Sequence, residues 1–510
     1  MQTLTYLRPS ALTGAGLDLQ TSGGRELAAH PRFFAGFATD APATAAGLLA
    51  VAEVARARYV NLSTTRLLDP VVTAAGDRLR FESFSGCGGV YARLDVLPRG
   101  LDGERCGFGT TNVDVNGPLR AALARVGGHD PLHLAVGPDD LTVTTFDGPV
   151  VEKKVPLPRR WLRGFAEVHV IASRFDLRAE LSGADAAAFL RRLPGGRDTL
   201  WVVPAGRSVR LTSRPVPGAV CLPGPGRLVA LRPLLRQTRT LRLYGPPVSA
   251  GSPPVASTWE LDLGPVRLSM TLSPEPARGF SGEGAALTAL AEDEVVDDAD
   301  RVAGVIGWDA TIDTAAVGAA TGLPAARVRA ALAQLGTAGR VGYDVAEAAY
   351  FHRELPYAAS EVDRLNPRLV AARALAEAGA VHPAPYGAVC SSSDGVVRPG
   401  PGAVVRPGPD GAVRPGPDGA GVASGEMTYY VASGEQTYHV RVDGAHRSCT
   451  CPWWARYRGG RGPCKHVLAV DMVQARTGPA DSAQAAGGRL DPGAADVVPN
   501  ATGVAGWAGE

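Results

Sequence analysis

The fold class that the sequence predicts is α+β, divided among several domains. The 510 residues exceed the roughly 250 to 300 at which a single hydrophobic core stops growing, so two to four folded units are expected. Hydrophobic residues make up 45% of the chain and charged residues 20%, which is ordinary for a globular protein. Strand-like and helix-like patterns alternate in the first half, and a Gly/Pro-rich stretch precedes a Cys/His cluster near the C-terminus. We therefore expect a mixed α+β body, a helical unit and a small metal-binding module.

Residues 1–285 are predicted to form the mixed α+β body, as one unit or two. Helices are expected near 42–57 and 183–192, and Gly/Pro turns separate six strand-like runs: DRLRFES, LHLAVG, LTVTTF, EVHVIA, TLWVVPA and TLRLYG. Four catalytic signatures are missing: the phosphate loop G-x-x-x-x-G-K-[ST], the dinucleotide fingerprint G-x-G-x-x-G after a strand, the nucleophile elbow G-x-S-x-G and the zinc-protease motif H-E-x-x-H. We do not expect an enzyme, and the remaining enzymatic alternative is an active site assembled from distant residues of 1–285.

Residues 297–355 predict a winged-helix-like domain of three helices and a hairpin. The third helix should begin after the break Thr321-Gly322-Leu323-Pro324, because Pro suits a first helical position. The spacing of Val317, Leu323, Val328, Leu332 and Leu335 suits a three-helix core. Arg327 and Arg329 on the third helix are accompanied by several carboxylates, so protein contact or a structural role is favoured over docking in a DNA groove. A further helix is expected near 367–379.

The stretch 383–425 is of low complexity, with RPGP at 398, 406 and 414. Pro favours extended backbone and Gly supplies bends, which predicts a semi-flexible linker between two folded parts. A local duplication follows, VASGEMTYY and then VASGEQTYH, of which only the second copy need be a strand of the next module. The tail at 479–510 is predicted to be disordered.

The sequence HRSCTCPWWARYRGGRGPCKHVLAVDMVQAR contains the metal-binding pattern. Cys449 and Cys451 stand one residue apart, twelve residues follow, and then Cys464 and His466 stand one residue apart. Zn²⁺ prefers four tetrahedral ligands drawn from thiolates and imidazoles, and sites closed by four protein ligands are usually structural. A redox-active pair is disfavoured because Cys-x-x-Cys is missing here. We expect one structural zinc ion in a module spanning 437–476, the competing interpretation being coincidental cysteines packed as small apolar residues.

This order of ligands resembles the SWIM zinc finger, whose four zinc ligands correspond to Cys449, Cys451, Cys464 and His466. TYHVRVDG before the motif is typical of a strand and KHVLAVDMVQAR after it of a helix, which agrees with the ββα arrangement that the resemblance implies. The rest of the chain resembles the long actinobacterial SWIM-containing proteins only in general layout. By this resemblance, the module mediates either DNA binding or protein–protein contacts.

Aromatic and basic residues are interleaved around the ligands and form the predicted contact set: Trp453, Trp454, Arg456, Tyr457, Arg458, Arg461 and Lys465. Such a surface suits phosphate contact and base stacking. The competing interpretation is that a Trp fills the small core and that the cations offset the roughly one negative charge left when three thiolates and a neutral imidazole bind Zn²⁺. The sequence leaves both open and favours the second.

Composition and the lack of targeting signals indicate where in the cell the protein is expected. A net charge of +2 among 52 basic and 50 acidic residues gives no global case for nucleic acid or an anionic membrane. The N-terminus lacks the pattern of a signal peptide, and no window reaches the roughly 18 apolar residues of a membrane span. The cysteines outside the motif lack a disulfide framework spacing. We expect a cytoplasmic protein.

The expected function is a protein-interaction adaptor whose partner is another protein. The alternative is a nucleic-acid-binding or regulatory protein that uses the basic and aromatic surface of the finger. Neither a membrane nor a small-molecule substrate is expected as a partner.

Overall fold

The computed structural model describes most of the body, the helical unit and the C-terminal module. The described residues are 32–59, 70–275, 294–355, 366–384, 426–444 and 446–477, with short pieces at 5–6, 11–12, 17–18, 22–23, 279–280, 284, 287, 405–407 and 413–415. The tail predicted at 479–510 lies outside the described residues. Among the described helices, none combines the length and the apolar character that a bilayer crossing requires.

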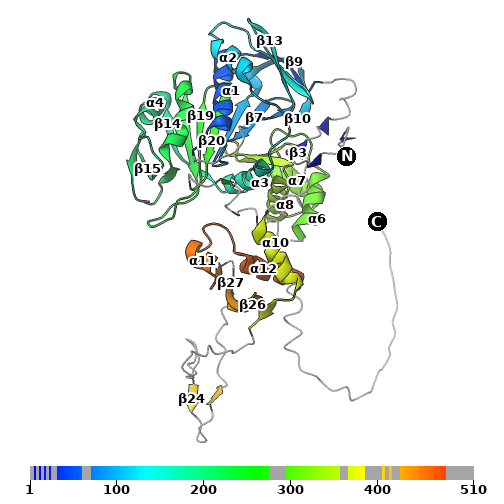
Figure 1. The fold of residues 1–510 in the computed structure, drawn as a ribbon, viewed down its shortest axis with the longest axis vertical. Coiled ribbons are helices and arrows are strands. Elements are labelled where there is room, and N and C mark those ends of the chain that lie inside the picture. Colours follow the sequence, from blue (N-terminus) through cyan, green and yellow to red (C-terminus); the bar gives the residue numbers. More distant parts are fainter. Residues whose placement is uncertain are drawn as a thin grey trace, which may run out of the picture.

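An eight-stranded antiparallel sheet runs through the body, with strand order β10-β6-β7-β8-β20-β19-β18-β14 (Figure 1). The strands are Phe108–Asn112 (β10), Val71–Ala75 (β6), Leu79–Phe84 (β7), Val90–Val96 (β8), Val266–Leu272 (β20), Ser257–Asp262 (β19), Thr240–Gly245 (β18) and Asp176–Ser182 (β14). Strands β8 and β20 pair along their whole length, from Val90 opposite Leu272 to Val96 opposite Val266. This pairing joins two parts of the chain that are far apart in sequence.

Two smaller antiparallel sheets complete the body. The five-stranded sheet has the order β13-β12-β11-β5-β9, and the three-stranded sheet has the order β16-β15-β17. The strands are Gly148–Lys153 (β13), Asp140–Thr145 (β12), His133–Val136 (β11), Phe34–Ala38 (β5), Leu101–Cys106 (β9), Ser208–Thr212 (β16), Thr199–Ala205 (β15) and Val220–Pro223 (β17). Near the N-terminus, short strands pair as Thr5–Tyr6 (β1) with Ser22–Gly23 (β4) and Ala11–Leu12 (β2) with Leu17–Asp18 (β3).

The body contains the same arrangement of elements twice. In the first half, β5 is followed by α1 (Ala41–Arg56), and α2 (Gly117–Arg125) precedes three consecutive strands, of which β11 pairs with β5. In the second half, β14 is followed by α4 (Gly183–Arg192), and the 3-10 helix η2 (Pro225–Arg236) precedes three consecutive strands, of which β18 pairs with β14. The neighbour orders β13-β12-β11-β5 and β20-β19-β18-β14 therefore correspond, which indicates an internal duplication.

Helix α1 covers one face of the eight-stranded sheet. The side chain of Asp40 accepts a hydrogen bond from the Ala43 backbone N–H (3.0 Å), and Pro42 follows in the first turn, which together define where the helix begins. Most of the helix is buried and packs on β7 and β8. Its Gly47 has no space for a side chain, because an added Cβ would lie 2.4 Å from Leu94 on β8.

The run EVHVIA, predicted as a strand, is instead the end of helix α3 (Arg159–Ala172). Trp161, Phe165 and His169 recur every four residues and are all buried, which is the period of a helix face. The β-branched residues near its end favoured a strand locally, and tertiary packing overrides that preference. The other five strand-like runs contain β7, β11, β12, β15 and β18.

Residues 294–355 form three helices and a hairpin: α6 (Glu294–Ala303), α7 (Thr314–Thr321), α8 (Ala325–Thr337), β21 (Val341–Asp344) and β22 (Ala349–His352). A Pro at position 324 precedes α8, and Gly322, in the left-handed region at φ 72°, ends α7. The five core residues predicted for this unit all lie in its apolar cluster. The winged-helix-like assignment itself stays a prediction.

A buried ion network joins this hairpin to the sheet. Asp344, at the end of β21, forms ion pairs with Arg93 (2.9 Å) and Arg267 (2.5 Å) and lies 3.9 Å from Arg80. Asp95 on β8 lies between Arg80 (3.2 Å) and Arg93 (3.0 Å). All five side chains are less than 10% exposed. The three guanidinium groups hold the pKa of Asp344 well below its ordinary value, against the opposing effect of burial.

A second polar cluster lies beside this network, under α3. One oxygen of Glu82 on β7 accepts hydrogen bonds from Tyr91 (2.6 Å) and Arg353 (2.7 Å). His169 Nδ1 accepts a hydrogen bond from the Tyr343 backbone N–H (3.0 Å), and its Nε2 lies 3.2 Å from a guanidinium nitrogen of Arg353. Burial and the positive charges of Arg353 and Arg93 lower the pKa of His169 well below its ordinary value, which keeps the imidazole neutral.

Replacing Asp344 should destabilise the whole body. An Asp344→Ala protein leaves three buried guanidinium groups without this carboxylate, a loss that typically costs about 3 to 5 kcal/mol. Urea unfolding of both proteins measures the difference. The matched control is Asp147→Ala, which breaks the exposed pair with Arg125 and should change the free energy of unfolding by less than about 1 kcal/mol. Equal effects of the two substitutions would contradict the role of the buried network.

The neutral state of His169 predicts how stability depends on pH. In the unfolded chain this group binds a proton as the pH falls through about 6.5, whereas in the folded chain it does not, so the free energy of unfolding decreases as the pH falls. Thermal unfolding between about pH 7 and pH 5 should show a steeper loss for the wild type than for His169→Gln. The two proteins share every other titrating group, so parallel curves would show that His169 is protonated in the folded state.

Candidate metal centre

A four-stranded sheet positions the C-terminal module, with strand order β23-β26-β27-β28. The strands are Val381–Pro383 (β23), Glu426–Ser433 (β26), Gln436–Asp443 (β27) and His446–Cys449 (β28). Strands β26 and β27 form a hairpin, with Ser433 opposite Gln436. Both copies of the duplicated segment therefore contribute residues to strands, whereas the sequence analysis needed only the second copy as a strand.

The Gly/Pro-rich stretch connects neighbouring strands of this one sheet. Strand β23 precedes the stretch and β26 follows it, and the two pair with Val381 opposite Val431. Within the stretch the structure describes one short pair, Val405–Pro407 (β24) with Val413–Pro415 (β25), in which each strand ends on the Arg-Pro that begins one of the RPGP repeats. The stretch is thus an insertion within the module, and it does not tether a separate finger to the body.

The module also packs against the rest of the protein. Helix α10 (Pro367–Glu377) precedes the insertion and packs on α12 (Lys465–Thr477), which follows the metal-binding pattern. Leu369 of α10 and Leu468 of α12 belong to the same apolar cluster as Phe165 of α3. In Figure 1, α10 lies between the finger elements and the α6–α8 unit. The finger is therefore held on the body through α10.

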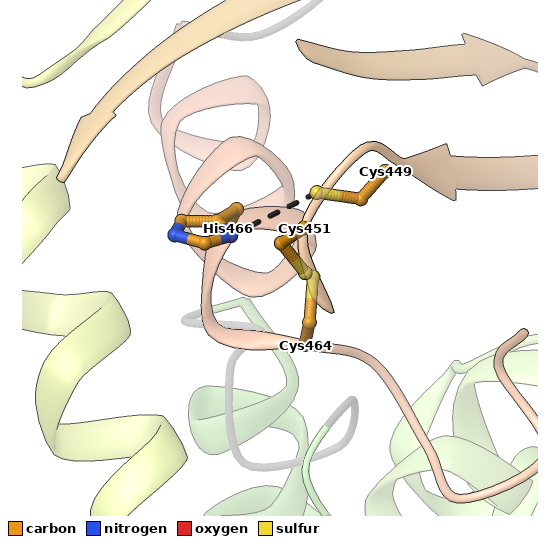
Figure 2. A group of neighbouring side chains, drawn as sticks. All are labelled: Cys449, Cys451, Cys464 and His466. Atoms are coloured by element: carbon orange, nitrogen blue, oxygen red, sulfur yellow. Dashed lines mark hydrogen bonds between the residues drawn. The ribbon is translucent and has the colours of Figure 1, made fainter. Parts of the chain in front are cut away.

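The four predicted ligands converge from three elements (Figure 2). Cys449 ends β28, Cys451 is the N-cap of α11 (Pro452–Tyr457), and Cys464 and His466 lie at the start of α12. Their ligand atoms all lie within 4.8 Å of one another, and the four residues are between 1% and 7% exposed. All four ligands lie within residues 449–466 of the module.

The local backbone is suited to thiolates. The Trp454 N–H donates to Cys451 Sγ (3.4 Å) and the Val467 N–H donates to Cys464 Sγ (3.4 Å), each from the first turn of a helix. Helix N-termini carry partial positive charge, so both positions favour a negatively charged sulfur. Cys449 Sγ lies 3.7 Å from His466 Nδ1, the ring nitrogen that faces the sulfur atoms.

The three thiols of the centre hydrogen-bond to one another. Hydrogen bonding to Cys451 raises the pKa of the Cys449 thiol, and hydrogen bonding from Cys449 lowers the pKa of Cys451. A bound divalent cation would allow all three thiols to ionise and would release their protons. The donor set suits Zn²⁺, because tetrahedral Zn–S bonds of about 2.3 Å place ligand atoms roughly 3.8 Å apart, inside the observed spread.

Two residues outside the predicted set support the centre. The Tyr438 ring stacks on the His466 imidazole, with centroids 4.2 Å apart and an interplanar angle of 24°. Arg368 of α10 donates to the backbone carbonyls of Arg461 (2.7 Å) and Pro463 (3.1 Å), which holds the loop just before Cys464. Tyr438 could have been found from its place on the strand before the motif. The role of Arg368 could not be predicted from the sequence, because it lies more than ninety residues before the Arg461 carbonyl that it contacts.

Much of the predicted contact set packs inside the module. The half-buried Trp453 lies under the guanidinium groups of Arg368 (4.5 Å) and Arg461 (5.4 Å) and contacts the ring of Tyr457 (4.6 Å). Trp454 is also half-buried and packs on the apolar cluster of the module. These aromatic residues are therefore packed against other residues of the chain, from α10 as well as from the module.

The basic members of the set divide into two groups. Lys465 donates to the Ser433 hydroxyl (2.8 Å), and Arg461 lies over Trp453 and Tyr457. Of the seven residues of the set, only Arg456 and Arg458 are exposed. Arg458 is in the left-handed region at φ 45° and ends α11, so this exposed pair is displayed at a fixed turn.

Comparison with known proteins identifies this module. Residues 438–470 match the SWIM zinc finger family, so this chain carries a SWIM zinc finger. No curated protein matches the chain. Among solved structures, the proliferating cellular nuclear antigen of Entamoeba histolytica is similar at 11% identity and TM-score 0.32, over 48% of this chain and 99% of that one. The PCNA2-PCNA3 complex from Sulfolobus tokodaii is similar at 10% identity and TM-score 0.34, over the same shares.

Removing one ligand should empty the centre and unfold the finger. Cys464→Ser and His466→Ala proteins should each lose the zinc that the wild type retains after stringent purification, because metal binding supplies much of the folding free energy of such small modules. Metal analysis and limited proteolysis measure the two effects, with new cleavage expected within 426–477. Cys87→Ala, a half-buried thiol of the body, is the control and should keep the metal. A His466→Ala protein that retained zinc would contradict the assignment.

Proposed function

We propose that this chain is a non-catalytic, cytoplasmic adaptor that binds a single Zn²⁺ for structure and recognises another protein through the exposed face of its SWIM finger. The observation that carries the proposal is the closed donor set. Four buried side chains supply the whole tetrahedral shell, which leaves no position on the ion for a substrate or an activated water. A bound zinc ion would link β28, α11 and α12 to one another. The exposed side chains of the finger would bind the partner protein.

The packing of the aromatic residues argues against a single-stranded nucleic acid as the partner of the finger. Base stacking requires open aromatic faces, whereas the guanidinium groups of Arg368 and Arg461 lie over the ring of Trp453. In the α6–α8 unit, Arg327 is held by Asp298 through two short contacts of 2.6 and 2.8 Å, which reduces its availability to a phosphate. The alternative, nucleic-acid binding by the finger, rests on the exposed Arg456 and Arg458.

The cytoplasmic location is part of the proposal. Cys87 and Cys221 are free thiols in the described body, which suits a reducing compartment. Burial raises the pKa of Cys221 to about 12, which keeps this thiol protonated at neutral pH.

Affinity capture with the zinc-loaded full chain tests the adaptor role. A protein partner should be enriched by the wild type and lost with Arg456→Glu/Arg458→Glu, a variant that should keep its zinc because neither side chain touches the ligands. The matched control is Arg207→Glu/Arg210→Glu, which changes the same charge on the body. Quantitative mass spectrometry of nuclease-treated extracts measures the enrichment.

The outcomes separate the two functions. Loss of the partner only in the finger variant supports the adaptor. A partner that is retained by the finger variant and by His466→Ala would remove the finger from recognition. Dependence of capture on intact nucleic acid would make the nucleic-acid alternative primary.

A further inference from the structure

The two halves of the body carry opposite net charges. Phe34–Lys153, the first half of the duplication, contains eleven basic and fourteen acidic residues, a net charge of −3. Asp176–Leu272, the second half, contains thirteen arginines, no lysine and six acidic residues, a net charge of +7. The total of +2 for the chain conceals this difference. A charge asymmetry between corresponding halves indicates an anionic partner for the second half.

Six of these arginines lie on the helical side of the second half and are here called the arginine face. They are Arg191 and Arg192 at the end of α4, Arg197 in the following loop, Arg232 and Arg236 on η2, and Arg239 just after it. All six are exposed, and within the described part of the chain no carboxylate lies within 4.0 Å of them. In the first half, by contrast, both arginines of α2 are paired, Arg120 with Glu53 (2.8 Å) and Arg125 with Asp147 (2.6 Å), and Arg56 at the end of α1 is the remaining helix arginine.

The arginine face is one surface. Helices α4 and η2 pack against each other, and the buried side of each contributes to the same apolar core, for example Leu190 and Leu231. The exposed sides of the two helices therefore lie next to each other on the surface. The Gly226 N–H donates to the Gly196 carbonyl (3.4 Å), which holds the loop that carries Arg197 against the start of η2.

The residues between the arginines decide what kind of anion fits. The outward positions of α4 are small, such as Ala184 and Ala188, and the one aromatic residue of the helix, Phe189, is half-buried and stacks on Trp259. Val229 is the one large apolar side chain exposed on η2. A protein interface normally needs a buried aromatic or apolar anchor, and a membrane surface needs apolar residues to insert. Arginine without such anchors suits phosphates, which guanidinium groups bind through two parallel hydrogen bonds.

We propose that the arginine face binds the phosphate backbone of double-stranded nucleic acid. A duplex presents its phosphates outward on a rigid framework and needs no aromatic platform, whereas a single strand is normally held by base stacking. Binding through phosphates alone is independent of base sequence. This surface is separate from the finger, so the inference does not rest on the proposed adaptor role.

The test measures the salt dependence of binding by the zinc-loaded full chain to a duplex of about 20 base pairs. The variant Arg192→Ala/Arg232→Ala/Arg236→Ala removes three arginines of the face. Each phosphate contact contributes about 0.9 to the slope of log K against log salt, so the wild-type Kd should rise roughly 40-fold more than the variant's between about 50 and 200 mM salt. All three side chains are exposed, and an unchanged melting temperature verifies that the variant folds.

The matched control is Arg207→Ala/Arg210→Ala/Arg214→Ala, which removes the same charge around β16. Val209 of β16 packs on the core under the helices, so Arg210, its neighbour, points to the opposite face of the sheet. This control should keep the wild-type slope, and so should the finger variant Arg456→Ala/Arg458→Ala.

Four results would overturn the proposal. They are no binding at low salt, an unchanged slope in the face variant, an equal reduction in the β16 control, and tighter binding to a single strand of the same length. Loss of binding in the finger variant alone would assign nucleic acid to the finger instead.

Discussion

The pairing of β8 with β20 is the interaction on which the remaining structure depends. It makes one continuous sheet from two halves that each have their own helices. The face under α1 is apolar, with Leu79, Leu94 and Leu268 in the core. The opposite face carries charged residues in register across three strands, with Arg80 opposite Asp95 and Asp95 opposite Arg267. Helix α3 and the β21–β22 hairpin can pack there only because Asp344 and Arg353 complete those charges.

This charged face shows why the sequence predicted the elements better than their assembly. The run LRFE in β7 alternates apolar and charged residues, which is typical of a sheet with one face in water. Nothing local to β7 reveals that Arg80 and Glu82 are covered by a hairpin more than 250 residues later. The duplication was also missed, because the two halves share an order of strands and helices without an evident sequence repeat. Local patterns specify strands and helices, whereas long-range charge pairing specifies which of them meet.

The metal centre was predictable for a different reason. Its four ligands lie within eighteen residues, so their spacing alone restricts the geometry. Its surroundings were not predictable to the same degree. Trp453 and Arg461 could be assigned either to a binding surface or to a core, and the choice depends on Arg368, which approaches from α10. The finger and the arginine face together give the chain two chemically distinct surfaces, one built around a metal and one built from unpaired charge.

The insertion between β23 and β26 has a consequence for how such a protein can change. Its two ends are fixed on adjacent strands, which lie about 4.8 Å apart in any sheet. The entropy of closing a loop between fixed ends grows with the logarithm of its length, and doubling the length costs only about 0.6 kcal/mol. A change in the number of RPGP repeats should therefore have little effect on the fold. The connection between β23 and β26 can therefore change in length while the metal ligands keep their geometry.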